Sequence, residues 1–353
     1  MLKRREFLSS AIVATGMAAL GSGARAQGLN QGLDPVNPDI RFGTTGSIFG
    51  TWRDGALRTS TDMRLMMRDI KHFGLEGFEP YSGQVQQYMD NPAAVKKLSA
   101  ETGVTLVDVG DLPRRTGSAP WKGNPWLGGE DNSRLVAEME SFARGFLQPM
   151  GCTHWKNNMG ARPENGPSDD QLKRLAETSN EIGRKTLAHG VRLALHPHIW
   201  GPMEREHEFR RVMELTDPRY VFLIMDTGHN VLGGMDVVKI TAEFLPRIAE
   251  FHLKDTFPQY RGNKATPMRE QHSKKSVYAS VGQGKGVDFP GIFKVMRDRK
   301  WKGWAVFDID APRPDDGTGT VDDNIAASVN YLRTALGVKL PPANGKTGLF
   351  KEG

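Results

Sequence analysis

Short apolar or alternating stretches recur along the chain, and a stretch with helical periodicity follows each of them. Short apolar or alternating runs are typical of strands, whereas apolar residues three and four positions apart are typical of helices. The predicted strands are the stretches 39–48, 74–81, 104–111, 152–159, 192–198, 221–229, 248–255 and 303–310. Their alternation with helices predicts parallel strands joined by right-handed crossovers.

A helix is predicted between each strand and the next, and a last one follows the final strand. The predicted helices cover 60–74, 91–103, 131–151, 168–190, 204–217, 236–247, 288–303 and 323–337. Ser168 is a typical N-cap, and Gly190 is a typical helix end. Repeated strand–helix units favour an α/β fold, a (β/α)8 TIM barrel, over an open doubly wound sheet. The glycine fingerprint of a dinucleotide site does not follow the first strand.

The chain divides into a leader, one barrel and a tail. Residues 1–26 combine Arg4-Arg5, a short apolar run and small residues before position 27, as in a twin-arginine export signal. Residues 27–337 are predicted to form the barrel, and 338–353 a polar tail. We therefore expect a periplasmic protein that has no membrane anchor after cleavage. Long connections after the third and seventh strands are expected to cover a site.

The charge of the chain argues against a nucleic-acid-binding protein, and its cysteine content excludes an internal disulfide. The leader holds four basic residues and one acidic residue, so its removal lowers the net charge from +6 to +3. The remaining basic residues form no run that would follow a phosphate backbone, and nucleic acid is not an expected partner. Cys152 is the only cysteine, which excludes an internal disulfide, and it is expected to pack in the core.

Ionisable side chains gather at the C-terminal ends of the predicted strands, on the face opposite the apolar positions. These inward residues are Glu79, His154, Lys156, His196, His198, Asp226, His252, Lys254, Asp308 and Asp310. Alternate residues of a barrel strand face the interior, so the side chains should meet at one mouth. Burying several such groups without partners is very costly, so they need one another, a cation, or both.

Neighbouring strands five to eight offer two imidazoles and two carboxylates. The residues are His196, Asp226, His252 and Asp308. This donor set suits one divalent metal ion such as Mn²⁺, Zn²⁺, Co²⁺ or Fe²⁺. The alternative is a salt-bridged polar cluster without metal.

Four segments resemble the xylose-isomerase-like barrel superfamily, which includes sugar phosphate isomerase/epimerases and inosose dehydratases. They are MDTGH (225–229), FHLKD (251–255), VGQGKGVDFPGIF (281–293) and LHPH (195–198), and the resemblance spans residues 39–337. It implies one divalent metal, Mn²⁺ first and Mg²⁺ also among the candidates, held by His196, Asp226, His252 and Asp308. Epimerases of this superfamily carry glutamates on strands five and eight. Here His196 and Asp308 stand in those places, which argues against a symmetric two-glutamate proton shuttle.

The resemblance and the site together predict removal of a proton α to a carbonyl of a keto-sugar, keto-glycoside or inosose, followed by β-elimination. His198 and His229 are the first candidates for base or acid, with Glu79, His154 and Lys156 as alternatives. Predicted substrate-binding residues are Trp52, Tyr81, Trp155, Trp200, Lys254 and Arg261. The alternatives are an isomerase or epimerase of a non-phosphorylated sugar, and a non-catalytic periplasmic sugar-binding barrel. The expected partner is a small carbohydrate, and a homo-oligomer stays open.

Overall fold

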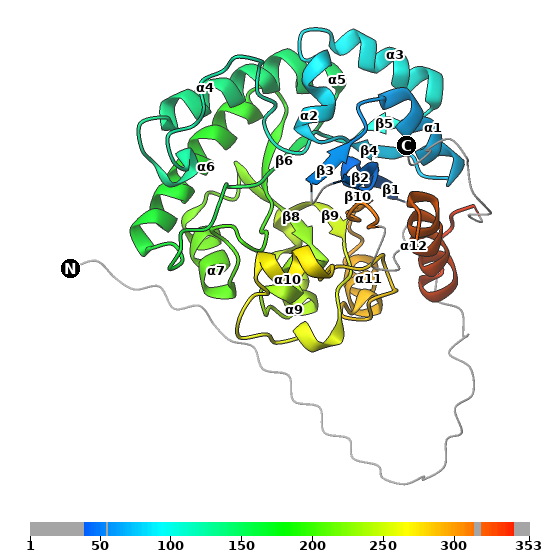
Figure 1. Ribbon diagram of the computed structural model, residues 1–353. Helices are drawn as coiled ribbons and strands as arrows, with labels where there is room; N and C mark the ends of the chain where they lie inside the picture. The colour runs from blue at the N-terminus through cyan, green and yellow to red at the C-terminus, as the bar shows by residue number, and fades with distance from the viewer. Residues whose placement is uncertain (1–38, 54–55, 314–318, 342–353) are drawn as a thin grey trace, which may run out of the picture. The chain divides into compact units, whose positions relative to one another are not determined.

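The computed structural model describes residues 39–53, 56–313 and 319–341 (Figure 1). The predicted leader and most of the predicted tail lie outside these residues. Eight strands form one parallel sheet in the order β5-β4-β1-β10-β9-β8-β7-β6. They are β1 (Ile40–Thr45), β4 (Gly77–Glu79), β5 (Thr105–Leu106), β6 (His154–Asn157), β7 (Arg192–Leu195), β8 (Val221–Asp226), β9 (Ile248–Leu253) and β10 (Gly303–Phe307). Each lies within a predicted strand, so the predicted order of strands is confirmed.

Side chains join the two edge strands of the sheet, β5 and β6, and close it into a barrel. Asp108 Oδ2 accepts a hydrogen bond from Lys156 N at 2.6 Å, and Asp111 N donates to Lys156 O at 3.1 Å. Asp111 Oδ1 also accepts from Asn158 N at 2.6 Å. Carboxylates therefore satisfy backbone donors that a regular strand ladder would otherwise pair.

Helices lie around the outside of the strands in Figure 1. The main helices are α1 (Met63–His72), α3 (Pro92–Thr102), α4 (Asn132–Phe142), α6 (Asp169–Leu187), α7 (Glu206–Leu215), α9 (Val237–Phe244), α11 (Phe289–Asp298) and α12 (Val321–Leu336). Each was predicted, although α12 begins two residues early. Ser168 caps α6 as expected, because its hydroxyl accepts from Gln171 N while Gln171 Oε1 accepts from Ser168 N. Among the described helices, none is both long and apolar enough to cross a membrane.

The structure also contains short elements that the pattern did not predict. They are the hairpin β2 (Gly50–Arg53) and β3 (Ala56–Thr59), helices α2 (Ser82–Val85), α8 (Thr227–Leu232) and α10 (Arg269–Lys274), and the single turns η1 (Gly46–Ile48), η2 (Gln86–Tyr88), η3 (Pro125–Leu127) and η6 (Pro258–Tyr260). The predicted helix 131–151 continues from α4 through the π-helix η4 (Ala143–Leu147) into α5 (Gln148–Met150), and the predicted helix 236–247 ends with η5 (Leu245–Arg247). The predicted strand 221–229 was too long. It ends at Asp226, whose carboxylate accepts from His229 N at 2.7 Å and caps α8.

The hydrophobic core lies between the strands and the surrounding helices. Cys152 is buried in it, as predicted for a packing residue. The first residues after α12 also belong to this core, since Val338 is buried and Arg333 Nε donates to Leu340 O at 2.9 Å. The C-terminal tail therefore begins as a packed segment.

Strands β1 and β4 approach closely at Gly43. A Cβ atom placed there would lie 2.6 Å from Gly77 O, which is backbone and cannot rotate away. We expect Gly43→Ala to lower the free energy of unfolding by about 1–3 kcal/mol, the usual cost of overpacking. Urea unfolding followed by circular dichroism measures this change. The control is Gly83→Ala in α2, where a Cβ has no neighbour within 4 Å and where alanine favours the helix. Equal stability of the two variants would contradict the interpretation.

Candidate active site at the barrel mouth

The C-terminal ends of β7 to β10 bring the four predicted metal ligands to one mouth. His196 directly follows β7, Asp226 ends β8, His252 lies on β9, and Asp308 directly follows β10. All four are at most 3% exposed. Because parallel strands of a barrel point the same way, their C-terminal ends share one face. The parity argument from sequence therefore placed these side chains in the same interior.

The ligating atoms of His196, Asp226, His229 and Asp308 lie within 4.8 Å of one another. His252, the remaining predicted ligand, presents Nδ1 at 3.4 Å from Asp308 Oδ2 and 3.9 Å from Asp226 Oδ2. We call these five residues the mouth cluster. It contains the predicted metal set and adds His229, which the sequence suggested as a base or acid.

A chain of hydrogen bonds orients His196. Asp111 Oδ2 accepts from Asn158 Nδ2 at 2.9 Å, which fixes the orientation of that amide. Asn158 Oδ1 then lies 2.8 Å from His196 Nδ1 and accepts its proton. The lone pair of His196 is therefore on Nε2, which lies 3.4 Å from Asp226 Oδ2. Such outer hydrogen bonds commonly fix the tautomer of a metal-ligating histidine.

His252 is oriented in the same way from the opposite side. Its Nε2 lies 2.7 Å from Glu79 Oε2 and donates to it. Its Nδ1 is buried and has no hydrogen-bond partner among the described residues. Burial alone would lower the pKa of His252, but Glu79 and Asp308 raise it well above its usual range. A second proton on His252, carried by Nδ1, would face the carboxylates of Asp226 and Asp308. A bound cation would take the place of that proton.

The two carboxylates of the mouth cluster have opposite pKa shifts. Burial and the charge of Asp308 raise the pKa of Asp226 to about 7. Burial would also raise the pKa of Asp308, but Lys254 and His252 hold it well below its usual range. Ser47 and Thr45 place hydroxyls 3.3 Å from Asp308 Oδ1 and stabilise its charge further. Asp308 is therefore readily ionised, whereas Asp226 needs an additional positive charge nearby to be fully ionised at neutral pH. A divalent cation would supply that charge, so the mouth cluster fits such an ion.

Two imidazoles stand beside the ligand set. The rings of His198 and His229 have centroids 3.6 Å apart. Burial lowers the pKa of His198 to about 4, and burial together with His198 lowers the pKa of His229 well below its usual value. Both are therefore neutral near pH 7 and able to accept a proton. Tyr278 places its hydroxyl 3.3 Å from His229 Nδ1.

Two buried lysines supply positive charge to the mouth. Lys254 Nζ lies 2.8 Å from Asp310 Oδ1 and 3.4 Å from Asp308 Oδ1, so it belongs to the predicted cluster. Lys156 Nζ lies over the ring of Tyr81, 5.3 Å from its centroid, and 4.0 Å from Asp111 Oδ2. The predicted residues Tyr81, Lys156 and Lys254 are therefore brought together around the mouth.

Several predicted site residues lie elsewhere. Trp155 is fully buried against Phe142 in the core, because its parity on β6 faces the helices. Arg261 donates to the carbonyls of Gly286 and Lys285 on the loop after β9. Trp155 and Arg261 therefore take no place at the mouth. The side chain of Trp52 lies outside the described part of the chain.

Two candidates for base or acid lie deeper than the mouth. His154 contacts Glu250 in the barrel interior, and Glu79 is held behind His252. Both are at most 2% exposed. His198 is less buried than either of them.

Both long loops are tied down beside the mouth. Trp200 Nε1 donates to Pro267 O at 2.8 Å, and Thr266 Oγ1 donates to Glu204 Oε1 at 2.6 Å, so the loop after β9 is fastened to the loop after β7. The ring of Trp200 lies 6.1 Å from that of His198. On the other side, Asn124 Nδ2 donates to Met159 O at 2.8 Å. The two loops therefore have fixed positions at the rim.

The sequence reading missed the residues that position the site. Asn158 shares the parity of His154 and Lys156 on the same stretch, so alternation could have found it.

Asp255 connects two of the segments that resemble the family, FHLKD and VGQGKGVDFPGIF. Its carboxylate accepts from Gly284 N, Lys285 N and Val287 N at 3.0–3.1 Å. The final aspartate of FHLKD therefore fastens the VGQGKG loop, as a structural partner of the site.

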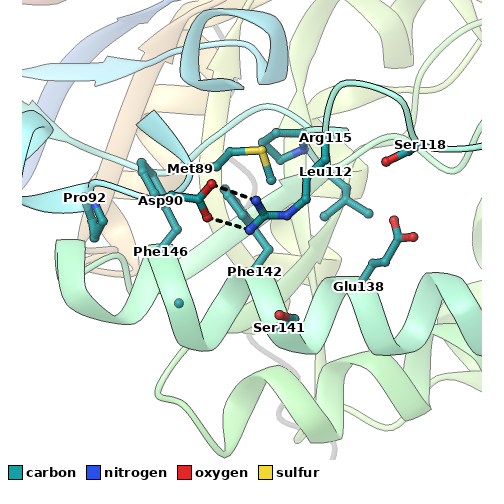
Figure 2. Close-up of a pocket in the computed structure, with 12 residues that line it drawn as sticks. Met89, Asp90, Pro92, Leu112, Arg115, Ser118, Glu138, Ser141, Phe142 and Phe146 are labelled. Atoms are coloured by element: carbon teal, nitrogen blue, oxygen red, sulfur yellow. Dashed lines mark hydrogen bonds and ion pairs between the residues drawn. The ribbon is translucent and has the colours of Figure 1, made fainter. Parts of the chain in front are cut away.

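Two cavities lie beside these elements. One of about 490 Å³ adjoins the mouth through Asn158 and is also lined by Asp111, Trp121 and Trp126. The other, of about 350 Å³, lies over Phe142 and Phe146, with the Asp90–Arg115 ion pair at its edge (Figure 2). It is lined by Met89, Asp90, Pro92, Leu112, Pro113, Arg115, Ser118, Glu138, Ser141, Phe142, Gly145 and Phe146, none of which belongs to the mouth cluster.

The chain is similar in sequence to known proteins. Inosose dehydratase of Geobacillus kaustophilus (strain HTA426) is 29% identical over 197 residues, which is 50% of this chain and 62% of that protein. The chain spans about half the length of the curated relatives it matches.

Solved structures are similar in fold. A sugar phosphate isomerase/epimerase from Parabacteroides distasonis ATCC 8503 has a TM-score of 0.61 and 16% identity, over 85% of this chain and 96% of that one. The 3-keto-D-glucoside 4-epimerase of E. coli has a TM-score of 0.58 and 18% identity, over 84% and 99%. The family model described as xylose isomerase-like TIM barrel matches residues 67–335. The chain therefore belongs to the xylose isomerase-like TIM barrel family.

Proposed function

We propose that the protein is a divalent-metal-dependent lyase. It would remove the proton α to the carbonyl of a keto-sugar, keto-glycoside or inosose and expel the β-oxygen. The observation that carries this proposal is the pair of neutral imidazoles, His198 and His229, beside a buried group of residues that could hold one cation, namely His196, Asp226, His229 and Asp308. Inosose dehydratases among the relatives support the same class of reaction.

The cation suited to this donor set is Mn²⁺, with Zn²⁺, Co²⁺, Fe²⁺ and Mg²⁺ as alternatives. When bound, it would stabilise the negative charge that develops on the carbonyl oxygen. His196, Asp226 and Asp308 would hold it together with His229, which lies within the same group. His252, the fourth ligand expected from the sequence, lies beside this group with Nδ1 3.4 Å from Asp308 Oδ2.

The chain's own groups would carry the proton. For a 3-keto-glucoside, an imidazole of the His198–His229 pair takes the proton from C2. The C–H electrons form the C1–C2 double bond as the C1–O bond breaks. The leaving oxygen takes a proton from a second group of the site, which acts as the acid. Lys254 and Lys156, both buried with positive charge near the mouth, would orient substrate oxygens.

Epimerisation is the second candidate, because a 3-keto-D-glucoside 4-epimerase shares the fold. A symmetric epimerase needs a proton carrier on each face of the sugar. The neutral imidazoles of His198 and His229 lie together, with ring centroids 3.6 Å apart and ring planes tilted by 39°. One-sided chemistry is therefore favoured.

Glycosides are the favoured substrates within this class. The cavity of about 490 Å³ beside Asn158 has room for an aglycone, and its tryptophans and amides are typical of carbohydrate sites. The twin-arginine-like leader supports export to the periplasm. Phosphorylated sugars are uncommon there, so a non-phosphorylated substrate is proposed.

The test is incubation of the Mn²⁺-loaded protein with methyl 3-keto-β-D-glucoside in heavy water, followed by NMR. The expected result is release of methanol at the rate at which the C2 proton signal disappears. Deuterium incorporation without methanol release would favour the isomerase or epimerase. Binding of the sugar without exchange or release would favour a non-catalytic barrel.

Replacing His198, the less buried imidazole of the pair, tests the base. We expect His198→Gln to lower kcat by about 10²- to 10⁴-fold, the usual contribution of general acid–base catalysis. Metal content should stay unchanged, because His198 is not one of the grouped ligands. His207→Gln is the matched control, since His207 has an 80% exposed side chain on α7. A kcat within threefold of the unmodified protein would exclude His198 from proton transfer.

Metal binding should also stabilise the fold. Adding Mn²⁺ to chelator-treated protein should raise the free energy of unfolding by about 3 kcal/mol once free metal exceeds its Kd about a hundredfold. Thermal and urea denaturation at several metal concentrations measure the increase. In Asp226→Asn the increase should shrink, whereas His207→Gln should keep it in full. An equal increase in Asp226→Asn would place the stabilising metal outside the mouth cluster.

A further inference from the structure

A second set of ionisable side chains lies inside the barrel, beneath the mouth. Glu250 precedes His252 by two residues on β9, and His154 precedes Lys156 by two on β6. Asp108, just after β5, completes the set. We call these three residues the inner cluster. All are at most 2% exposed, at a depth where TIM barrels are usually filled by branched apolar side chains.

Two carboxylates of the inner cluster converge on one imidazole from different walls of the barrel. Glu250 Oε2 contacts His154 Nε2, and Asp108 Oδ2 lies 4.0 Å from the same nitrogen. Thr153 Oγ1 lies 3.3 Å from His154 Nδ1 and can accept its proton. The hydrogen bond between His154 Nε2 and Glu250 Oε2 needs one proton, and a cation that displaced this proton would meet the Nε2 lone pair and the two carboxylates.

Each carboxylate also has a buried oxygen without a hydrogen bond of normal length among the described residues. These atoms are Glu250 Oε1, which lies 3.6 Å from His252 Nε2, and Asp108 Oδ1. The same holds for Glu79 Oε1 on the adjoining strand. Buried carboxylate oxygens without a donor are destabilising, so a positive group is expected among them.

We propose that the inner cluster binds a second divalent cation, separate from the one in the mouth. One atom each from Asp108, His154 and Glu250 lies within 4.8 Å of the others, as ligands of a single ion must. One imidazole nitrogen and carboxylate oxygens suit Zn²⁺ or Mn²⁺. A divalent ion would balance the two negative charges that Asp108 and Glu250 carry when both are ionised.

This cation would have a structural role. Asp108 belongs to the seam where β5 and β6 meet, whereas Glu250 lies on β9 in another part of the sheet. An ion between them would join the seam to another wall of the barrel. It would leave the mouth cluster free to hold the reactive cation.

Metal analysis of the whole protein tests the inference. The protein is purified, equilibrated with Zn²⁺, freed of loose metal and analysed by inductively coupled plasma mass spectrometry. We expect two equivalents in the unmodified chain. One equivalent should remain in the mouth variant Asp226→Asn/Asp308→Asn and one in the inner variant Glu250→Gln.

Each result separates the two sites. A single equivalent that survives in the mouth variant and is lost in Glu250→Gln would support the inner site and overturn the mouth site. A single equivalent that is lost in the mouth variant would overturn the inner site, and the inner residues would then share protons.

Crystals of the unmodified protein, measured at the zinc absorption edge, decide the question even if Glu250→Gln fails to fold. An anomalous peak among Asp108, His154 and Glu250 is expected. A water peak or no density at that point would overturn the proposal.

Discussion

The structure depends on one constraint. Many ionisable side chains are buried inside the barrel, and each needs a hydrogen bond or an opposite charge from the protein in place of water. His252 illustrates how this is met, because Glu79 satisfies one ring nitrogen while the other faces Asp226 and Asp308. Lys254 lies beside Asp308 and Asp310, and Lys156 lies beside Asp111, so the buried carboxylates have positive partners within the barrel.

Aspartates at strand ends perform a second task that also shapes the site. Asp108 and Asp111 close the seam by accepting backbone hydrogens of the neighbouring strand. Asp255 fastens the glycine-rich loop, and Asp226 caps α8 while facing the mouth cluster. Backbone order and charge placement therefore rest on the same carboxylates. Changes at these residues would alter the position of neighbouring groups as well as their charge.

The barrel separates two environments along its axis. The mouth combines neutral imidazoles, lysines and fixed loops beside a cavity of about 490 Å³. The inner cluster is closed on every side and is suited to a structural role. Membership of the xylose isomerase-like family explains the scaffold, while the particular side chains at each depth determine what this chain can bind.

The sequence by itself determined the barrel and the faces of its strands, because hydrophobic periodicity is a local property of the chain. It also placed His196, Asp226, His252 and Asp308 at one mouth, since parallel strands share a direction. Only the tertiary structure decided which side chains contact one another. Asp111 reaches Asn158, Glu79 reaches His252 across 173 positions, and Trp155 turns to the core. Such contacts depend on how distant strands pack and on where a strand gives way to a helix, which no local pattern records.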